Sequence, residues 1–162
     1  MSEYVLSTYP ADTHMLRVPI GPIPSEVTKE YGTWKGTRAF RPYRLEADAM
    51  VVTPKKLILI EGKVFRIRDG IGALATYRPL VPLTPELKVY LDRPLVCQLV
   101  TANPPRWLDQ VAQVHDIEIV VFEPPWIADY VEHMNKYWTA EHRYGRLKRK
   151  QVLENLGFKD GA

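Results

Sequence analysis

Residues 46–63 read EADAMVVTPKKLILIEGK, and this stretch decides the fold. Its apolar runs predict two β-strands joined by a tight turn at Thr53–Lys56. When the strands are folded about the middle of that turn, Asp48 comes to lie opposite Glu61. Lys63 is two residues beyond Glu61, so strand alternation places it on the same face. The sequence therefore predicts two carboxylates and an ammonium at one point of an antiparallel hairpin.

This grouping of charges needs a physical reason. Opposed side chains have Cβ atoms roughly 5 Å apart, and like charges at that separation repel. A bound divalent cation is one reason, because Mg²⁺ prefers oxygen ligands and usually binds through one or two carboxylates. The alternative is an ordinary solvated edge of the sheet, where Lys63 simply pairs with Asp48 and Glu61. Exposed pairs of that kind contribute roughly 0–1 kcal/mol.

The composition fits a single globular domain of 162 residues, large enough to bury a proper core. The net charge of +3 fits an anionic partner without requiring one. The only cysteine, Cys97, excludes an intrachain disulfide and fits a reducing compartment. No apolar stretch approaches the ~20 residues of a membrane span, and no signal peptide is visible. We therefore expect a cytoplasmic protein that does not enter the membrane.

The rest of the chain predicts helices around this hairpin. We expect residues 1–24, rich in proline, to form an extended N-terminal arm, residues 25–138 to form the main domain, and residues 139–162 to form a basic helical tail. Within the domain the expected elements are a helix over 25–31, the hairpin, a helix over 69–78, a strand over 95–101, a helix over 103–114, a strand over 117–122 and a helix over 123–138.

This order of elements predicts an α/β fold. A strand, a helix of about ten residues and a second strand make a βαβ unit, so strands 95–101 and 117–122 should be parallel. The domain should then hold a mixed β-sheet, with an antiparallel hairpin and a βαβ unit, flanked by helices. Four aromatic side chains fall on the apolar stripes of the later helices and are expected in the core: Trp107, Trp126, Tyr130 and Trp138.

An Asp on one strand followed by Glu-x-Lys on the next, with a helix before and a helix and βαβ unit after, resembles the PD-(D/E)xK nuclease superfamily, whose fold is restriction-endonuclease-like. The matching residues are Asp48, Glu61, Gly62 and Lys63, and the resemblance covers roughly residues 25–135. It implies a Mg²⁺-dependent deoxyribonuclease, with Mn²⁺ as a substitute. In such a site Asp48 and Glu61 bind the metal, the Gly62 carbonyl adds a ligand, and Lys63 assists hydrolysis of the phosphodiester.

The chain departs from the family pattern at several positions. Many members carry a further Glu on the first helix, where Glu26 and Glu30 are both candidates. Glu46 lies on the same strand face as Asp48 and is a further candidate ligand. One branch of the family carries Gln-x-x-x-Tyr on the helix after the site, and here Tyr77 is present while the Gln position is alanine. We expect Tyr77 to be a core residue rather than a catalytic one.

Two groups of cations are candidates for contacts with nucleic acid. One alternates with aromatic residues before the hairpin, and the other lies in the tail. Their members are Arg38, Arg41, Arg44, Arg143, Arg146, Lys148, Arg149 and Lys150. The alternatives are that the first group packs its side-chain stems on the sheet and that the second is a solvated face.

DNA is the expected partner, RNA is possible, and the chain is a candidate for a homodimer or a larger nucleoprotein assembly. A different class of function stays open beside the nuclease. A nuclease-fold module without turnover, such as a phage or mobile-element component, would use the N-terminal arm and the basic tail to bind partners.

Overall fold

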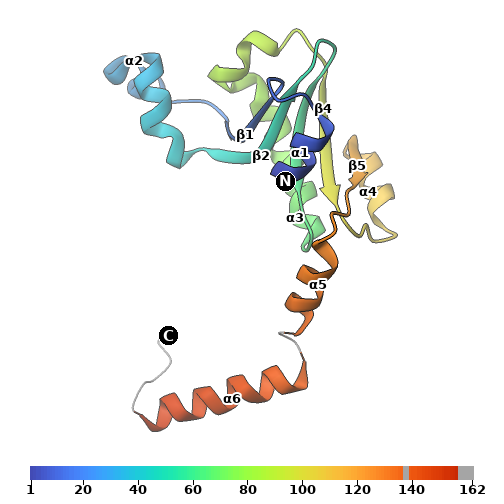
Figure 1. Ribbon diagram of the computed structural model, residues 1–162. Coiled ribbons are helices and arrows are strands. Elements are labelled where there is room, and N and C mark those ends of the chain that lie inside the picture. Colours follow the sequence, from blue (N-terminus) through green and yellow to red (C-terminus); the bar gives the residue numbers. More distant parts are fainter. Residues whose placement is uncertain (137–138, 157–162) are drawn as a thin grey trace. The chain divides into compact units, whose positions relative to one another are not determined.

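The structure, a computed structural model, describes residues 1–136 and 139–156, without the side chains of residues 33 and 34. The chain divides into two units, Met1–Phe122 and Glu123–Ala162. The first unit is an α/β domain with a mixed, open five-stranded sheet flanked by helices (Figure 1). The second holds two helices within its described residues, 123–136 and 139–156.

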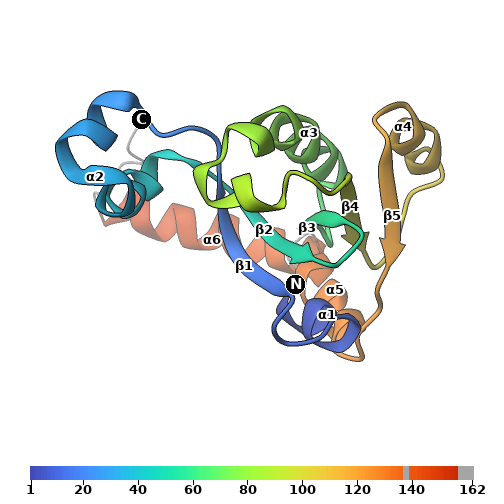
Figure 2. The ribbon, with the colours of Figure 1, turned by 90° about the horizontal axis from the view of Figure 1, so that it is seen from above.

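The sheet has the strand order β1-β2-β3-β4-β5 (Figure 2). Its strands are β1 (His14–Ile20), β2 (Leu45–Val52), β3 (Leu57–Gly62), β4 (Leu95–Thr101) and β5 (Ile117–Val121). The first three strands pair antiparallel, and β4 and β5 then continue the sheet in parallel with β3. The predicted antiparallel hairpin and parallel βαβ unit are therefore both confirmed.

The register of the β2–β3 hairpin is the predicted one. Ala49 pairs with Ile60 and Val52 with Leu57, so the next pair outward is Asp48 opposite Glu61. The Thr53 amide donates to the Lys56 carbonyl at 2.9 Å, which closes the turn. The Thr53 hydroxyl accepts a hydrogen bond from the Lys56 amide, also at 2.9 Å. Proline and threonine in the turn thus fix the pairing, as their local chemistry requires.

Helices cover both faces of the sheet. α3 (Ile67–Tyr77), the 3₁₀ turns η2 (Arg78–Leu83) and η3 (Pro85–Tyr90), and α4 (Leu108–Val114) share one core with the sheet. That core includes Leu59, Ile71, Leu74, Leu99 and Leu108. The opposite face packs against α1 (Ser2–Thr8) through Tyr4, Val5, Val51, Ile60 and Val100.

The N-terminal residues form core elements in place of the extended arm that we expected. Tyr4 and Val5 of α1 are 5% and 0% exposed, and Val18 and Ile20 of β1 are buried against β2. The proline content was misleading because β1 is an edge strand. Pro19 lacks an amide hydrogen, and an edge strand tolerates this loss where a central strand would not.

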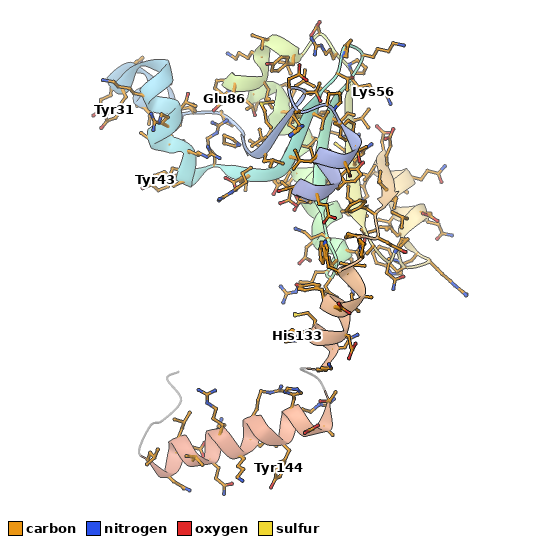
Figure 3. All side chains as sticks on the ribbon, in the orientation of Figure 1. Tyr31, Tyr43, Lys56, Glu86, His133 and Tyr144 are labelled. Carbon is orange, nitrogen blue, oxygen red and sulfur yellow. The ribbon has the colours of Figure 1, made fainter. Side chains whose placement is uncertain are left out.

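The helix expected over 25–31 continues past its predicted end. α2 spans Ser25–Phe40, and Gly32 interrupts it with φ 73° and ψ 162° before the helix resumes. The short 3₁₀ turn η1 (Arg41–Tyr43) then leads into β2. Figures 1 and 2 both show α2 beyond the β1 edge of the sheet, and Tyr31 lies on its outer part in Figure 3. Gly32 therefore acts as a kink rather than as the end of the helix.

The second unit consists of α5 (Ile127–Lys136) and α6 (Ala140–Asn155). The expected burial of the helix aromatics is wrong at three positions, because Trp107, Trp126 and Tyr130 are 40%, 47% and 40% exposed. Trp138 lies outside the described residues. Within residues 1–136 and 139–156, no helix is long and apolar enough to cross a membrane.

Candidate metal and phosphodiester site

Asp48, Glu61 and Lys63 meet at the end of β3, as strand alternation predicts. Lys63 Nζ donates to Glu61 Oε1 at 2.7 Å. Asp48 Oδ2 accepts the Gly62 amide at 2.8 Å. The Lys63 amide donates to the Val100 carbonyl at 2.9 Å, which extends the pairing of β3 with β4 by one residue. Two strands therefore hold both carboxylates and the ammonium in one place.

Glu61 is the most unusual residue of this group. It is only 4% exposed, and its Oε2 atom has no hydrogen-bond partner among the described residues. Burial raises the pKa of Glu61 above its ordinary value, and the charge of Asp48 adds to this effect, whereas the Lys63 hydrogen bond opposes it. A buried polar atom without a partner costs about 1–3 kcal/mol. A cation beside Oε2 would remove that cost.

Lys63 keeps its positive charge in this environment. Burial acts to lower the pKa of the Lys63 ammonium, but the Glu61 hydrogen bond and the charges of Glu61 and Asp48 outweigh it, so the net shift is upward. Its side chain is 29% exposed. The ammonium can therefore reach a ligand from its open side while Glu61 holds it from the other.

A second buried oxygen lies beside Lys63. Thr101 is 2% exposed, and in the described part of the chain its Oγ1 atom has no hydrogen-bond partner. Because Val100 pairs with Gly62, Thr101 is the next residue along β4 and neighbours Lys63 across the strands. No sequence signal marks this position, since a lone threonine in an apolar strand is ordinary.

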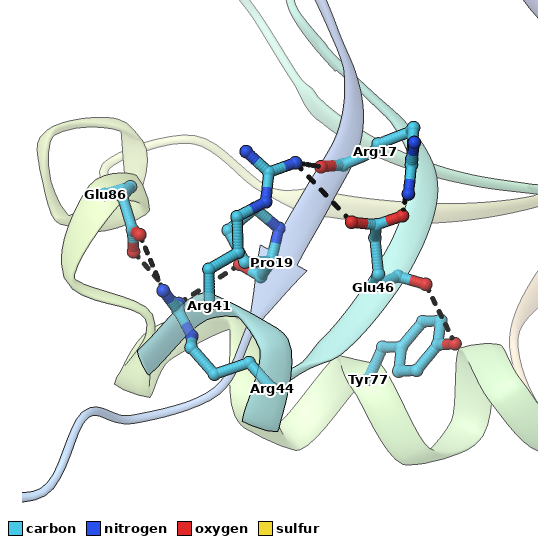
Figure 4. Close-up of polar contacts among 7 residues, drawn as sticks. All are labelled: Arg17, Pro19, Arg41, Arg44, Glu46, Tyr77 and Glu86. Atoms are coloured by element: carbon cyan, nitrogen blue, oxygen red, sulfur yellow. Dashed lines mark hydrogen bonds and ion pairs between the residues drawn. The ribbon is translucent and has the colours of Figure 1, made fainter. Parts of the chain in front are cut away.

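Tyr77 approaches the same face of the sheet from α3. Its hydroxyl donates to the Glu46 backbone carbonyl at 3.2 Å (Figure 4). Burial raises the pKa of Tyr77, and the negative charge of Glu61 adds to the rise. The side chain is half-buried, so Tyr77 links α3 to β2 next to the carboxylates and does not lie wholly inside the core.

Glu46 and Glu30 are not brought to the carboxylate pair. Glu46 directs its carboxylate to Arg17 Nε at 2.8 Å and Arg41 Nη2 at 3.5 Å (Figure 4), and the Arg17 hydrogen bond lowers its pKa. Glu30 is exposed on α2, where it pairs with the Tyr31 hydroxyl. Among the described residues, no three His, Cys, Asp or Glu side chains form a group able to hold a metal. The site consists of two carboxylates.

The arginines before the hairpin differ in their surroundings. The Arg44 side chain is only 1% exposed. It donates two hydrogen bonds to the Glu86 carboxylate, at 2.6 and 2.9 Å, and a third to the Pro19 carbonyl (Figure 4). Arg41 donates to the Arg17 carbonyl at 2.7 Å. Arg38 is exposed near the end of α2. Arg44 is therefore a structural residue, in line with the alternative that these side chains pack on the sheet.

The cations of the tail all lie on α6. Thr139 caps this helix by accepting the His142 amide at 3.4 Å. Arg143, Lys148, Arg149 and Lys150 are exposed and Arg146 is half-buried. At 100° per residue, Arg143, Arg146 and Lys150 share one side of the helix. All five cations belong to the second unit.

A hollow at the start of α3 is not predictable from the sequence pattern. It has a volume of about 550 Å³ and is lined by Arg66, Ile67, Arg68, Asp69 and Trp107. Four of these residues open α3, directly after Lys63-Val64-Phe65. We had assigned Trp107 to the core because it falls on the stripe of α4. Its exposure could have been expected from its position at the start of that helix, where a side chain is less often buried by neighbouring elements.

Gly70 sets how closely α3 approaches the site, and this gives a testable expectation. A Cβ atom at Gly70 would lie 2.6 Å from Leu99 Cδ1 and 2.9 Å from Lys63 Cγ. Gly70→Ala should therefore destabilise the protein by about 1–3 kcal/mol, the usual cost of overpacking. Urea unfolding measures this change.

Gly72 is the matched control on the same helix. Within the residues that the structure describes, no atom lies within 4 Å of a Cβ built at Gly72. Gly72→Ala should stabilise the protein by about 0.5–1 kcal/mol, because alanine is the better helix former. Equal effects of the two substitutions would show that α3 does not press on Lys63 and Leu99.

Comparison of the chain with protein-family models, with curated proteins and with solved structures finds no match.

Proposed function

We propose that the protein is a metal-dependent nuclease that hydrolyses phosphodiester bonds in DNA, with a site of the PD-(D/E)xK type. One observation carries the proposal. Glu61, opposite Asp48, buries its Oε2 atom without a hydrogen-bond partner in the described residues, while its other oxygen, Oε1, accepts from the Lys63 ammonium at 2.7 Å. Structural ion pairs normally satisfy both oxygens, because an orphaned buried atom is costly. In a carboxylate that binds a metal, the unpartnered oxygen is available to coordinate the ion.

The residues fit a hard divalent cation. Asp48 and Glu61 supply carboxylate oxygens, and the Gly62 backbone carbonyl supplies a third candidate oxygen from the residue between Glu61 and Lys63. Mg²⁺ is typically held by one or two carboxylates, with water and substrate phosphate in the other positions. When bound, the metal supplies Lewis-acid activation of the phosphodiester and neutralises part of its charge.

Besides the metal, the proposed site contains one positive charge from the protein, the Lys63 ammonium. Its ammonium is oriented by Glu61 and keeps an exposed side. A donor held in this way can orient the attacking water or stabilise the charge that develops on the phosphoryl oxygens. The upward shift of the Lys63 pKa supports this role, because the group stays charged over the whole range in which a nuclease works.

The topology supports the same proposal. A helix precedes the hairpin, Asp48 lies on β2, Glu61 ends β3, and α3 leads to a parallel β4. This is the order of elements that the resemblance implies. The exposed cations of α6 provide a surface suited to a polyanion such as DNA.

The direct test is calorimetric titration of Mg²⁺ and Mn²⁺ into the wild type and the Asp48→Asn variant, with cleavage of supercoiled plasmid followed in parallel. We expect binding and metal-dependent nicking in the wild type, and loss of both in the variant. Asp129→Asn, which removes an exposed carboxylate from α5, is the control and should behave as wild type. Metal-independent behaviour of all three proteins would make the carboxylate pair structural and would refute the nuclease.

A second candidate function is a nuclease-fold module that assembles with a partner and has no turnover. The observation that favours it is the exposure of large apolar side chains on the second unit, among them Trp126, Tyr130 and Met134. Because contiguous exposed apolar patches commonly mark interaction sites, such a module would co-purify with a partner. It would bind no Mg²⁺ and would leave plasmid intact.

A further inference from the structure

The hollow at the start of α3 has the composition of a binding site. Arg66, Arg68 and Asp69 line the hollow together with Trp107, around a space of about 550 Å³. The lining thus brings two cations, one carboxylate and one aromatic ring. All four of these residues are exposed rather than packed into the core. A groove that combines arginines with an accessible aromatic ring is typical of sites for single-stranded nucleic acid.

Arg66 is held in an unusual backbone conformation. Its φ of 53° lies in the left-handed region, which a residue with a side chain rarely adopts. Glycine would occupy this position without strain. Non-glycine residues in this region occur mostly where function or the surrounding structure requires them. An arginine therefore occupies a position whose backbone conformation favours glycine.

Trp107 supplies the flat surface. It is 40% exposed at the position before α4, while the next residue, Leu108, is fully buried and anchors the helix. The base of a single strand presents its face to an aromatic ring, and such stacking tolerates any base. In a closed duplex the faces are already covered by neighbouring base pairs. Trp107 in this hollow therefore selects an unpaired base.

The start of α3 lines the hollow and leads directly to Gly70, which packs against Lys63 of the proposed metal site. The lining residues 66–69 come directly before Gly70, which also packs against Leu99. The helix rises roughly 1.5 Å per residue, so the first turn of α3 lies within about 6 Å of Gly70. One helix start thus lines the hollow and also packs against the side chain of Lys63.

We propose that this hollow binds single-stranded nucleic acid, with Arg66 and Arg68 on its phosphates and Trp107 stacked on an unpaired base. This inference rests on the proposed nuclease function. It identifies the substrate of the metal site as a single strand or an unpaired end. Its test does not depend on metal or on cleavage.

The experiment measures fluorescence anisotropy of a labelled oligothymidylate of about 12 nucleotides, with the full chain in EDTA. Trp107→Leu should weaken binding at least about tenfold, whereas Trp107→Tyr, which keeps an aromatic face, should stay within about threefold. The affinity for a closed duplex without unpaired bases, a relaxed covalently closed circle used as a competitor, should change less than about twofold in either variant. Thermal unfolding confirms that each variant is folded.

The arginines have their own readout, which is the salt dependence. Arg66→Gly with Arg68→Ala should lessen the slope of log affinity against log salt by about 1.4, since each phosphate contact on a single strand contributes about 0.7. Glycine at 66 suits the left-handed backbone, so this variant should fold. The control is Lys55→Ala with Lys56→Ala, which removes two exposed cations from the β2–β3 turn and should leave the slope unchanged. Figure 3 labels Lys56 at this turn.

Three results would overturn the proposal. They are wild-type affinity of Trp107→Leu for the oligothymidylate, an equal loss for the closed duplex, and competition by thymidine monophosphate as strong as that by the oligonucleotide. If instead the variants lose binding while the wild type neither binds metal nor cleaves plasmid, the hollow is a nucleic-acid site and only the nuclease proposal fails.

Discussion

Lys63→Met should lower plasmid cleavage by a factor of about 10²–10⁴ while Mn²⁺ still binds, because the ammonium acts on the reacting phosphate and the ligands are the carboxylates. The methionine keeps most of the length of the side chain, so contacts with Gly70 and α3 are retained. Single-turnover cleavage at saturating metal measures the rate, and calorimetry measures the affinity. The result separates turnover from metal binding, which removal of a carboxylate does not.

The same variant has a second expected effect, on the pH dependence of metal binding. The Lys63 hydrogen bond and charge hold down the pKa of Glu61, which burial would otherwise raise further. Without the ammonium, Glu61 should need a higher pH to ionise, so the midpoint of Mn²⁺ binding should move upward. Lys56→Met, at the exposed turn of the same hairpin, is the control for both effects. Wild-type cleavage by Lys63→Met would remove Lys63 from the reaction.

The hairpin was predictable because its information is local. Alternation fixes which side chains share a face, and Thr53 and Lys56 close the turn that sets the register. A slip of one residue would move Glu61 to the other face of the sheet, so the apolar pattern of β3 strongly specifies the pairing. The meeting of Asp48, Glu61 and Lys63 therefore followed from sequence alone.

Other features depend on contacts that the sequence does not encode locally. Arg44 was a candidate for nucleic acid, and its burial depends on Glu86, which lies 42 residues further along the chain. Glu46 has the alternation of a metal ligand, but Arg17, on a strand that we did not predict, takes its carboxylate. Trp107 has the spacing of a core residue and instead lines a hollow. For Arg44 and Glu46 a distant partner overrides the local pattern.

Glu61→Gln should make the metal-free protein more stable near neutral pH and should abolish metal binding. Burial raises the pKa of Glu61, so the folded state binds its proton more tightly than the unfolded state does. The corresponding stability is fully present below the unfolded pKa of about 4.3 and is lost as the pH rises through the higher folded value. Glutamine carries no charge at any pH and avoids this loss.

We expect the variant to be more stable than the wild type by about 1 kcal/mol at pH 7–8, because an unpartnered neutral amide costs less to bury than an unpartnered charged oxygen. The difference should shrink toward pH 4, where Glu61 is protonated in both states. Glutamine has the shape of glutamate, and its side-chain oxygen can still accept the Lys63 hydrogen bond. Urea unfolding in EDTA at several pH values measures the trend.

Metal should reverse this order of stability. A ligand that binds only the folded state adds about 2.7 kcal/mol at a concentration 100 times its Kd. Wild type should gain this in Mn²⁺ and overtake the Glu61→Gln variant, which should gain nothing. Glu132→Gln is the control. The Lys136 hydrogen bond lowers the pKa of Glu132 on an exposed helix face, so this variant should gain no stability over the wild type as the pH rises. If the Glu61→Gln variant is less stable than the wild type in EDTA at pH 8, the Glu61 carboxylate stabilises the fold through Lys63. Its unpartnered oxygen would then not be a metal ligand.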